Sequence, residues 1–460
     1  MHQAPAGAQD AAALYAAAVV KRPNLIFIVA DDLGYADLGC YGGRDAGFGP
    51  VSPNIDRLAA GGLRLTQGYA NSPVCSPTRF ALMTMRYQYR VRGGMEEPIN
   101  SRSRGSTTLG LPPEIPTLPS LLREAGYATA LVGKWHLGYP PAFGPLRSGY
   151  DEFYGIMAGG VDYFTHCSSR GDHDLYLGEA EHREPGYLTD LLSRRAVEYV
   201  QEQAAAARAG RPFFLSLHYT APHWPWETRD DGHLAAQLAQ NLFHLDGGSV
   251  ETYRRMIHHM DEGIGALVDA LRRERLLEDT LVVFTSDNGG ERFSDNWPLV
   301  GGKMDLTEGG IRVPWIAHWP AAIPAGRTSR QHCMTMDWSA TLLELGGGSP
   351  HPDYPLDGVS LAAVLREPDR TFERPLYWRM KHRQQRALRR GDWKYLKVDS
   401  HEYLFDLAAD ERERANLAGR QPDRLAALRE DWLDWNATVP AIPEDAAVSL
   451  GYSEADMPSR

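Results

Sequence analysis

The chain has 460 residues, of which 43% are hydrophobic and 23% charged, proportions that exclude a disordered chain, a fibre and a coiled coil. Its 48 Lys and Arg residues are outnumbered by 59 Asp and Glu residues, which gives a formal net charge of -11. We therefore expect no nucleic-acid partner, because general nucleic-acid binding needs a cationic surface. The four cysteines form no C-x-x-C pair, which excludes zinc ribbons and thioredoxin-type redox motifs.

Most of the chain alternates between predicted strands and predicted helices. In chain order these are a strand at 25–30, helices at 54–60, 77–83 and 117–125, a strand at 129–132, a helix at 188–207, a strand at 212–219, a helix at 251–276, strands at 281–285 and 311–318, and a helix at 337–345. The continuous apolar strands suit a parallel sheet that is buried on both faces. We therefore predict an α/β fold whose large, mostly parallel sheet is sandwiched by helices.

The texture changes from about residue 370. Short aromatic-rich runs at 375–380, 385–398 and 403–407 and a helical pattern at 423–436 predict a small C-terminal antiparallel sheet with a helix. We expect a catalytic α/β domain over 20–370 and a C-terminal α+β subdomain over 371–460. The basic residues between Arg379 and Lys397 favour a solvated face of this small sheet; a rim that steers polyanionic substrates is the alternative.

The chain shows no segment that would fix its compartment. The longest apolar runs, at 25–30 and 281–284, are far shorter than the roughly 20 residues that a membrane span needs, so we expect no membrane partner. The N-terminus lacks the basic segment and apolar core of a signal peptide. As given, the chain favours the cytoplasm; a processed form would be periplasmic or secreted.

Three polar clusters directly follow predicted strands. Asp31 and Asp32 follow the first strand, Lys134 and His136 follow the strand at 129–132, and Asp287 and Asn288 follow the strand at 281–285. In open α/β sheets, ligands bind beyond the carboxyl ends of the strands. We therefore expect the fold to bring these clusters together.

Four of these residues form an oxygen-rich set: Asp31, Asp32, Asp287 and Asn288. Carboxylates that lie together repel one another and raise one another's pKa unless a cation sits among them. Oxygen ligands favour Ca²⁺ or Mg²⁺ over zinc, and Mn²⁺ is also compatible. The alternative for Asp31 and Asp32 alone is a helix cap and a solvated acid.

The segment Cys75-Ser76-Pro77-Thr78-Arg79 is the most distinctive motif. Proline is tolerated in the first turn of a helix, so we expect a helix to begin at Pro77 with Cys75 at its positive end. Arg79 lies one turn further and projects from the same face. From the residues alone, Cys75 is either a buried structural thiol or a thiolate nucleophile for which His136 is the base.

This segment resembles the C-x-P-x-R signature of type I sulfatases, members of the alkaline phosphatase superfamily. The resemblance continues in the family's order at 23–32, 53–58, 133–138, 218–223, 286–289, 301–303 and 308–314. It implies a sulfuric ester hydrolase that cleaves aryl or carbohydrate sulfate monoesters. It also implies that Cys75 is oxidised by a formylglycine-generating enzyme to 3-oxoalanine, known as formylglycine. One hydroxyl of the aldehyde hydrate attacks sulfur and the other expels sulfate.

The resemblance also implies a role for each site residue. Asp31, Asp32, Asp287 and Asn288 match the calcium ligands. Arg79 matches the arginine that stabilises the hydrate, Lys134 and His136 match the pair that contacts it, and His136 is the expected base of the release step. His223 matches the histidine that protonates the leaving oxygen, and Lys303 matches a second sulfate-binding cation. His218 is expected to be a supporting residue and Arg312 a structural one.

The substrate is a sulfated small molecule or carbohydrate whose identity the sequence leaves open. The serine that many family members place after the Lys-x-His segment is missing from 149–163, so no residue is assigned there. Trp224 and Trp226 stack on a ring of the substrate or pack beneath their loop. Candidates for the rim of the pocket are His166, Arg170 and His173.

Two other functions compete with sulfate ester hydrolysis. One is hydrolysis of phosphonate or phosphate esters, a chemistry of the same superfamily. A phosphate monoester carries about two negative charges near neutral pH, whereas a sulfate monoester carries one. The other is non-catalytic binding of sulfate esters by a protein whose Cys75 is never oxidised. The oxidation state of Cys75 separates the second alternative from the enzymes.

Overall fold

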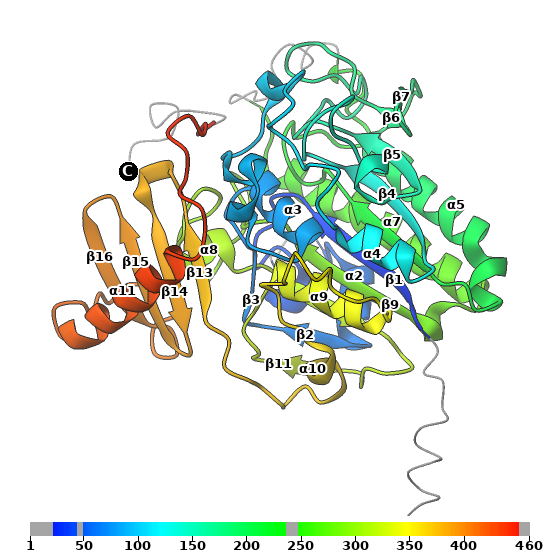
Figure 1. Ribbon diagram of the computed structural model, residues 1–460. Coiled ribbons are helices and arrows are strands. Elements are labelled where there is room, and N and C mark those ends of the chain that lie inside the picture. The colour runs from blue at the N-terminus through cyan, green and yellow to red at the C-terminus, as the bar shows by residue number, and fades with distance from the viewer. Residues whose placement is uncertain (1–21, 44–48, 236–246, 450–460) are drawn as a thin grey trace, which may run out of the picture.

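The computed structural model describes residues 22–43, 49–235 and 247–449. Its main feature is a ten-stranded sheet in the order β11-β2-β10-β9-β1-β8-β4-β5-β6-β7 (Figure 1). The N-terminal segment that was compared with a signal peptide, and residues 20–21 and 450–460 of the two expected parts, lie outside the described residues. Within the described residues, no helix combines the length and the apolar content that crossing a membrane requires.

The centre of the large sheet is parallel and its flanks are mixed. The strands are β1 (Asn24–Ala30), β2 (Leu63–Leu65), β4 (Ala128–Lys134), β5 (Glu152–Ile156), β6 (Tyr176–Leu177), β7 (Ala180–Glu181), β8 (Phe213–His218), β9 (Thr280–Ser286), β10 (Trp315–His318) and β11 (Arg327–Ser329). Strands β9, β1, β8, β4 and β5 pair in parallel, whereas β10 and β6 run antiparallel to their inner neighbours. The predicted fold class is confirmed; the short strands of the flanks were not predicted.

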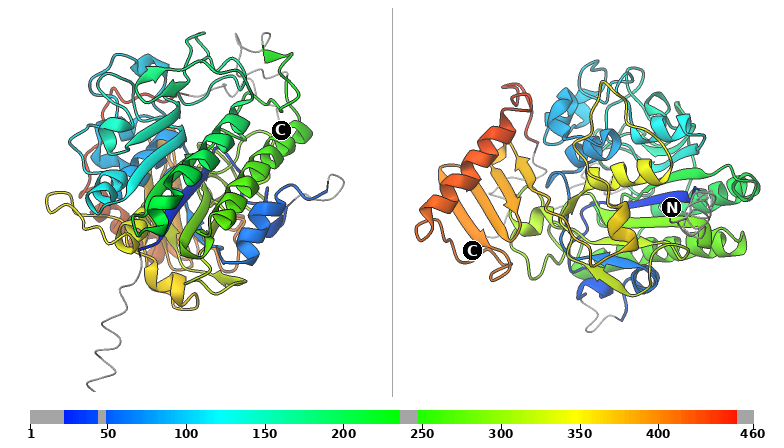
Figure 2. Two further views of the ribbon diagram at one scale, coloured as in Figure 1. Left: turned by 90° about the vertical axis from the view of Figure 1, so that its right-hand side faces the viewer. Right: turned by 60° about the horizontal axis from the view of Figure 1, so that its bottom comes forward.

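Helices cover both faces of this sheet, as the two views of Figure 2 show. Helices α2 (Pro53–Ala60), α5 (Leu188–Arg208) and α7 (Val250–Arg273) share one hydrophobic core with one face of the sheet. Helices α3 (Cys75–Thr84), α4 (Leu118–Glu124), α9 (Thr335–Leu345) and α10 (Ala362–Arg366) share a second core with the other face. In β1, Ile26 and Ile28 point into the first core and Leu25 and Phe27 into the second, which explains the uninterrupted apolar run.

Two predicted boundaries differ from the structure. Helix α3 begins at Cys75 rather than at Pro77, because the first turn of a helix has no intrahelical partner for the N–H that proline lacks. The strand predicted at 311–318 forms only over β10, and its first residue ends the short helix α8 (Glu308–Ile311). Between α8 and β10, Arg312 forms an isolated β-bridge with Tyr69 of β3 (Gly68–Tyr69). Strand β3 also pairs with β12 (Cys333–Met334).

A second, four-stranded antiparallel sheet lies beside the first (Figure 1). It consists of β13 (Leu376–Arg379), β14 (Arg386–Arg390), β15 (Trp393–Val398) and β16 (His401–Asp406), in sequence order. One face packs against the main body, and α11 (Pro422–Asn436) packs on the other through Leu425, Leu428 and Trp432. The short 3-10 helices are Gly39–Tyr41, Gln88–Arg90, Arg92–Met95, Ser101–Ser103, Leu146–Ser148, Leu277–Asp279 and His382–Gln384, the last named η7.

The expected solvated basic face of the small sheet is wrong for three of its residues. Arg379, Arg389 and Lys394 are buried. Lys394 lies between the carboxylates of Glu308 and Glu413, at 2.9 and 2.8 Å. Both faces of the small sheet are covered, so a strand position that would face solvent in a sheet with one exposed face is buried here. A buried cation at such a position requires charged partners.

Candidate active site

The parallel register of the central strands brings the polar clusters together. Ala30 of β1 pairs with Ser286 of β9, so Asp31 and Asp287 leave adjacent strand ends. The backbone N–H of Asp32 donates to Asp287 Oδ1 at 3.3 Å. Lys134, the last residue of β4, places its Nζ 2.5 Å from Asp31 Oδ2. The three clusters expected from the sequence therefore form one buried site.

Arg79 connects the helix that carries Cys75 to two of these strand ends. Its Nε and Nη2 donate to Asp287 Oδ2 at 3.1 and 2.9 Å, and its Nη1 donates to the carbonyl oxygen of Lys134 at 3.0 Å. The Arg79 side chain is 1% exposed. A buried guanidinium that uses several donors at once holds its neighbours in a fixed geometry, so Arg79 positions α3 relative to the sheet.

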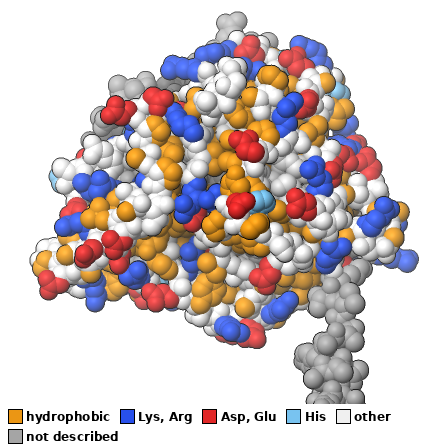
Figure 3. Space-filling model, viewed as in Figure 1, with side chains coloured by type: hydrophobic (Ala, Val, Ile, Leu, Met, Phe, Trp, Pro, Cys, Tyr) orange, Lys and Arg blue, Asp and Glu red, His pale blue; other side chains and the backbone are white. Residues whose placement is uncertain are grey.

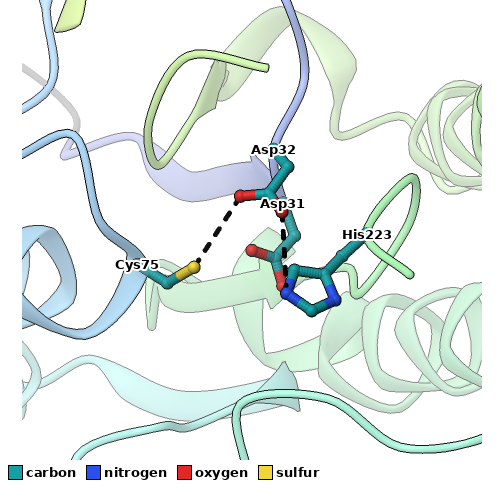
Figure 4. Close-up of side chains that lie close together, drawn as sticks. All are labelled: Asp31, Asp32, Cys75 and His223. Carbon is teal, nitrogen blue, oxygen red and sulfur yellow. Dashed lines mark hydrogen bonds and ion pairs between the residues drawn. The ribbon is translucent and has the colours of Figure 1, made fainter. Parts of the chain in front are cut away.

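Asp32 is the centre of the site, as Figure 4 shows. Its carboxylate lies 3.8 Å from Cys75 Sγ, 3.6 Å from His223 Nε2 and 2.6 Å from Lys303 Nζ. Its backbone φ is 63°, in the left-handed region that non-glycine residues rarely occupy. Such strain persists where the surroundings hold it, commonly at functional sites.

Buried side chains at the centre of the site could hold a metal ion. Potential ligand atoms of Asp31, Asp32, Cys75 and His223 all lie within 4.8 Å of one another. Among the described residues, the buried oxygens Asp31 Oδ1 and Asn288 Oδ1 have no hydrogen-bond partner. Buried acceptors without partners are costly, and a cation among them would remove that cost.

The pKa values at the site reflect the same crowding of carboxylates. Burial and then the charge of Asp31 raise the pKa of Asp287 to about 7. Burial also acts to raise the pKa of Asp32, but the positive charge of Lys303 and the charge of His223 outweigh it and hold that pKa below its ordinary value. The pocket therefore contains carboxylates that need positive charge beside them.

Burial disfavours the thiolate form of an unmodified Cys75. It is the first residue of α3 and is 2% exposed. Burial raises the pKa of its thiol well above the ordinary value, although Lys134 and Lys303 act in the opposite direction. Because the thiolate is the reactive form of cysteine, the structure argues against the thiolate alternative.

His136 is held in one tautomer by the backbone. Its Nε2 donates to the carbonyl oxygen of Ile99 at 2.6 Å, so in the neutral ring Nδ1 is the acceptor. Nδ1 is buried and has no partner among the described residues. Burial and then the charge of Lys134 lower the pKa of His136 well below its ordinary value. The ring is therefore neutral and has a free acceptor, as a base requires.

His223 is fixed in a similar way. Its Nδ1 donates to the carbonyl oxygen of Trp224 at 2.6 Å, which directs Nε2 towards Asp32. Burial and then the charge of Lys303 lower the pKa of His223 well below its ordinary value, while Asp32 acts to raise it. In the neutral ring Nε2 therefore carries no proton, and a general-acid role requires the doubly protonated ring, which the Asp32 carboxylate beside Nε2 favours.

The cationic groups lie inside the site rather than on the surface. Lys134 is fully buried, and Lys303 is 14% exposed and also contacts Glu291 at 3.0 Å. On the face of the molecule drawn in Figure 3, acidic and basic side chains are interspersed rather than gathered by sign. A negatively charged group beside Cys75 would therefore meet fixed positive charges that are buried in the site.

The remaining side chains that the sequence suggested near the pocket differ in their surroundings. His218 contacts Arg79 Nη1 at 3.4 Å, in keeping with a supporting position. Trp226 is buried against Phe293, whereas Trp224 lines the cavity. His166 and His173 bond to backbone carbonyls of Gly186 and His182.

Several groups of the site could not be found from the motifs. Gly159 and Gly160, rather than a serine, line the wall after the Lys-x-His segment. The carbonyl of Ile99 orients His136 and is a backbone group without a sequence signal. Glu291 pairs with Lys303; its position three residues after Asn288 is only a weak sequence signal for this role.

Several of these groups line one cavity of about 830 Å³. Cys75, His136, His223 and Lys303 line one part of it. His382, Arg383 and Asp399, from the small sheet and its turns, line another part. Both sheets therefore contribute to the same cavity.

Comparisons with known proteins show what this chain is similar to. The family model described as Sulfatase matches residues 23–348. The chain is 34% identical to N-acetylgalactosamine-6-sulfatase of Canis lupus familiaris over 397 residues, which cover 80% of this chain and 70% of that protein. It is 32% identical to arylsulfatase A of Homo sapiens over 490 residues, which cover 95% of this chain and 91% of that protein. The solved structure of Ps i-CgsB in complex with k-i-k-neocarrahexaose is similar, with a TM-score of 0.81, 32% identity and coverage of 91% of this chain and 94% of that one.

Proposed function

The chain belongs to the sulfatase family of the alkaline phosphatase superfamily, and from that membership we propose that it hydrolyses carbohydrate sulfate monoesters with formylglycine at residue 75 and a divalent cation. The reaction class, sulfuric ester hydrolysis, follows from the family. The observation that carries the proposed mechanism is the position of Cys75, whose sulfur lies 3.8 Å from Asp32.

A carbohydrate is favoured over an aryl group as the rest of the substrate. One relative is an N-acetylgalactosamine-6-sulfatase, and a structural neighbour was solved with a neocarrahexaose. The cavity of about 830 Å³ is lined by many polar groups, among them Asn100, Ser101, Ser168 and Ser169. A sugar has hydroxyl groups for these partners, whereas an aryl ring would leave them without any.

Asp31, Asp32, Asp287 and Asn288 are the residues that would hold the cation, for which Ca²⁺ fits the oxygen donors and Mg²⁺ or Mn²⁺ is the alternative. When bound, the cation would act as a Lewis acid and lower the pKa of a hydroxyl on residue 75. The unpartnered oxygens of Asp31 and Asn288 support this assignment.

The side chains around residue 75 divide the remaining work. Lys134 and Lys303 offset the negative charge of the sulfate group, and Arg79 holds α3 in place against Asp287. His223, once it is doubly protonated beside Asp32, donates the Nε2 proton to the leaving oxygen as the ester S–O bond breaks. His136 Nδ1 accepts the proton of the remaining hydroxyl on residue 75 as sulfate departs.

Maturation requires a partner, a formylglycine-generating enzyme that oxidises the Cys75 thiol. Cys75 is the first residue of α3 and is 2% exposed. An enzyme cannot reach a side chain buried to this extent, so we propose that oxidation precedes folding.

The test is a turnover assay combined with the mass of the peptide that contains residue 75. The protein is produced with and without a formylglycine-generating enzyme. It is assayed with calcium on N-acetylgalactosamine 6-sulfate, neocarra-oligosaccharide sulfates and 4-nitrophenyl sulfate, and on matching phosphate and phosphonate esters. We expect multiple turnover of sulfate esters only for protein with the formylglycine mass.

Cys75→Ala is the matched variant of this test. We expect it to retain the fold, seen in an unchanged thermal midpoint, and to lose multiple turnover. Undiminished turnover by this variant would remove residue 75 from the mechanism. Faster turnover of phosphonate than of sulfate esters would favour the alternative enzyme, and an unconverted thiol in protein from its native source would favour a binding protein.

We also propose the division into a catalytic part over 20–370 and a C-terminal part over 371–460. It is supported by the separate four-stranded sheet that begins at Leu376 and by the core that this sheet forms with α11. The second part is then a wall of the substrate cavity as well as a packing partner.

A further inference from the structure

The active-site cavity continues beyond the catalytic cluster to the small sheet. Two turns at one end of that sheet reach it: η7, between β13 and β14, and the β15–β16 turn, which starts at Asp399. His382, Arg383 and Asp399 of these turns line the cavity together with Cys75. Its volume of about 830 Å³ is near the upper end of the ~300–1,000 Å³ of ligand pockets. A sulfate group and one sugar would leave this distal part empty.

The distal part presents paired charges. Arg383 Nε donates to Asp399 Oδ2 at 3.1 Å, and the side chains are 53% and 50% exposed. The two turns are also joined by a backbone hydrogen bond from Asp399 N to Arg383 O at 2.8 Å. A guanidinium beside a carboxylate offers donors and acceptors next to each other without net charge. This arrangement matches neighbouring sugar hydroxyls better than a second anion.

The backbone of these turns is strained and firmly held. Arg383, Gln384 and Asp399 have φ values of 52°, 46° and 52°, in the left-handed region that non-glycine residues rarely occupy. Strain of this kind, gathered at one wall of a cavity, persists only where other contacts determine the backbone. The wall is therefore a defined feature of the fold rather than a loose loop.

Two buried side chains hold the turn from opposite sides. Glu97 accepts hydrogen bonds from the backbone N–H groups of Lys381 and His382 at 2.7 and 2.9 Å. Gln385 donates to Met304 O at 2.8 Å and accepts from Leu306 N at 2.8 Å. Glu97 is two residues from Ile99, which orients His136, and Met304 follows Lys303. The distal wall is thus fixed relative to the catalytic groups.

The side chains that line the cavity suit a chain of sugars. Trp224 and Tyr139 line the cavity, and Trp224 packs against the ring of His223 with centroids 4.2 Å apart. Sugar rings present apolar C–H faces to aromatic side chains and hydroxyls to polar ones. The cavity that Cys75 and Arg383 both line therefore offers both kinds of surface.

We propose that the natural leaving group is an oligosaccharide of at least two sugar units that extends from residue 75 to the Arg383–Asp399 pair. This pair is the specificity-determining contact for the distal sugar. The inference rests on the proposed function. It adds the length of the substrate and the residues that bind its distal sugar.

The first test measures kcat and KM of the mature wild-type protein over substrates of increasing length. The probes are 4-nitrophenyl sulfate, N-acetylgalactosamine 6-sulfate, and sulfated di-, tetra- and hexasaccharides of the neocarra and N-acetylgalactosamine types. We expect kcat/KM to rise about 10- to 100-fold from the monosaccharide to the best oligosaccharide. Equal values across lengths, or turnover of the aryl ester alone, would overturn the inference.

The second test uses Arg383→Ala and Asp399→Asn. We expect each to lower kcat/KM about 10- to 100-fold on the oligosaccharide, mainly through KM, and to leave 4-nitrophenyl sulfate unchanged. Arg370→Ala is the matched control, because Arg370 is also in an exposed ion pair, with Glu367, and should change neither. An equal loss on both substrates, or no loss on either, would overturn the assignment.

The two proposals fail in distinguishable ways. If the mature protein turns over no sulfate ester, the proposed function fails. If it turns over sulfate esters without regard to length, only the oligosaccharide inference fails. Retained aryl sulfatase activity in the variants shows that they are folded, and the wild-type length series needs no variant.

Discussion

Single side chains set the distances at the site, and Gly159 shows how tightly. A Cβ atom at this position would lie 2.6 Å from both Cε1 and Nε2 of His136. The Nε2 atom is the one that donates to Ile99. Glycine at 159 is therefore required by the close approach of the backbone to the ring.

Gly159→Ala should displace the His136 ring and disturb its tautomer. We expect kcat to fall about 10²-fold, since an error of about 1 Å in placing a catalytic group has this effect. The control is Gly144→Ala, because a Cβ there meets nothing within 4 Å. Steady-state kinetics on a sulfate ester checks this, and an unchanged kcat for Gly159→Ala would argue against His136 as the base.

The unpartnered oxygen of Asp31 leads to a prediction about metal binding. Added Ca²⁺ should raise the thermal midpoint of the wild-type protein, by a stabilisation of about 2.7 kcal/mol at 100 times the dissociation constant, and a chelator should reverse it. In Asp31→Asn the response should be much weaker. Asp423→Asn, on the exposed side of α11, should respond like the wild type; a full response of Asp31→Asn would contradict the assigned ligand set.

At the scale of elements, two loops beside the site are joined by a buried pair of carboxyl groups. Asp162 accepts hydrogen bonds from Phe164 N and Thr165 N at 3.0 and 2.6 Å. Glu227 accepts from Tyr163 N at 3.0 Å, and the Tyr163 hydroxyl donates to the carbonyl of His223 at 2.9 Å. The pair therefore supports the loop that carries His223.

This pair predicts a pH dependence of stability. Burial and then the nearby Asp162 carboxylate raise the pKa of Glu227 from 4.5 to about 8, and Asp231 adds to the effect. The folded state keeps a proton that the unfolded state releases above about pH 4.5. Raising the pH from there to about 8 therefore lowers the free energy of unfolding, by up to about 1.4 kcal/mol per pH unit.

Glu227→Gln removes this titration while keeping the shape of the side chain. The free energy of unfolding is measured in urea at several pH values between about 5 and 8. As the pH rises, the free energy of unfolding of the variant should increase relative to that of the wild type. Glu430→Gln, at an exposed position of α11, should run parallel to the wild type. A constant difference between wild type and Glu227→Gln would show that Glu227 does not hold a proton in the folded state.

At the scale of the whole molecule, a buried ion network connects the small sheet to helix α8 of the main body. Lys394 of β15 contacts Glu308 at the start of α8 and Glu413, and Arg389 lies 3.6 Å from Glu308. The residues are at most 2% exposed. Removing one partner would leave buried charges without compensation.

Lys394→Met is therefore expected to lower the free energy of unfolding by about 3–5 kcal/mol. Lys397→Met, on the same strand but half-buried, should change it by less than about 0.5 kcal/mol. Urea unfolding followed by fluorescence measures both. Similar small effects of the two variants would mean that the ion network does not stabilise the packing of the small sheet against the main body.

The sequence by itself determined the alternation of strands and helices, the fold class and the family. These depend on local patterns: apolar runs such as 25–30, turn residues after them, and the segment from Cys75 to Arg79. It also placed Asp31 and Asp287 at strand ends, and parallel pairing brings such ends to one edge whatever the details of packing.

Only the tertiary structure decided which groups complete the site. Ile99 meets His136, Glu97 meets the turn at Lys381, and Arg383 meets Asp399 through contacts between segments that are not adjacent in the chain. Lys394 is buried because the small sheet is covered on both faces, which a strand pattern cannot reveal. Backbone carbonyls, strained turns and buried ion pairs leave no periodic signal in a sequence, since their energy comes from neighbours that folding alone brings near.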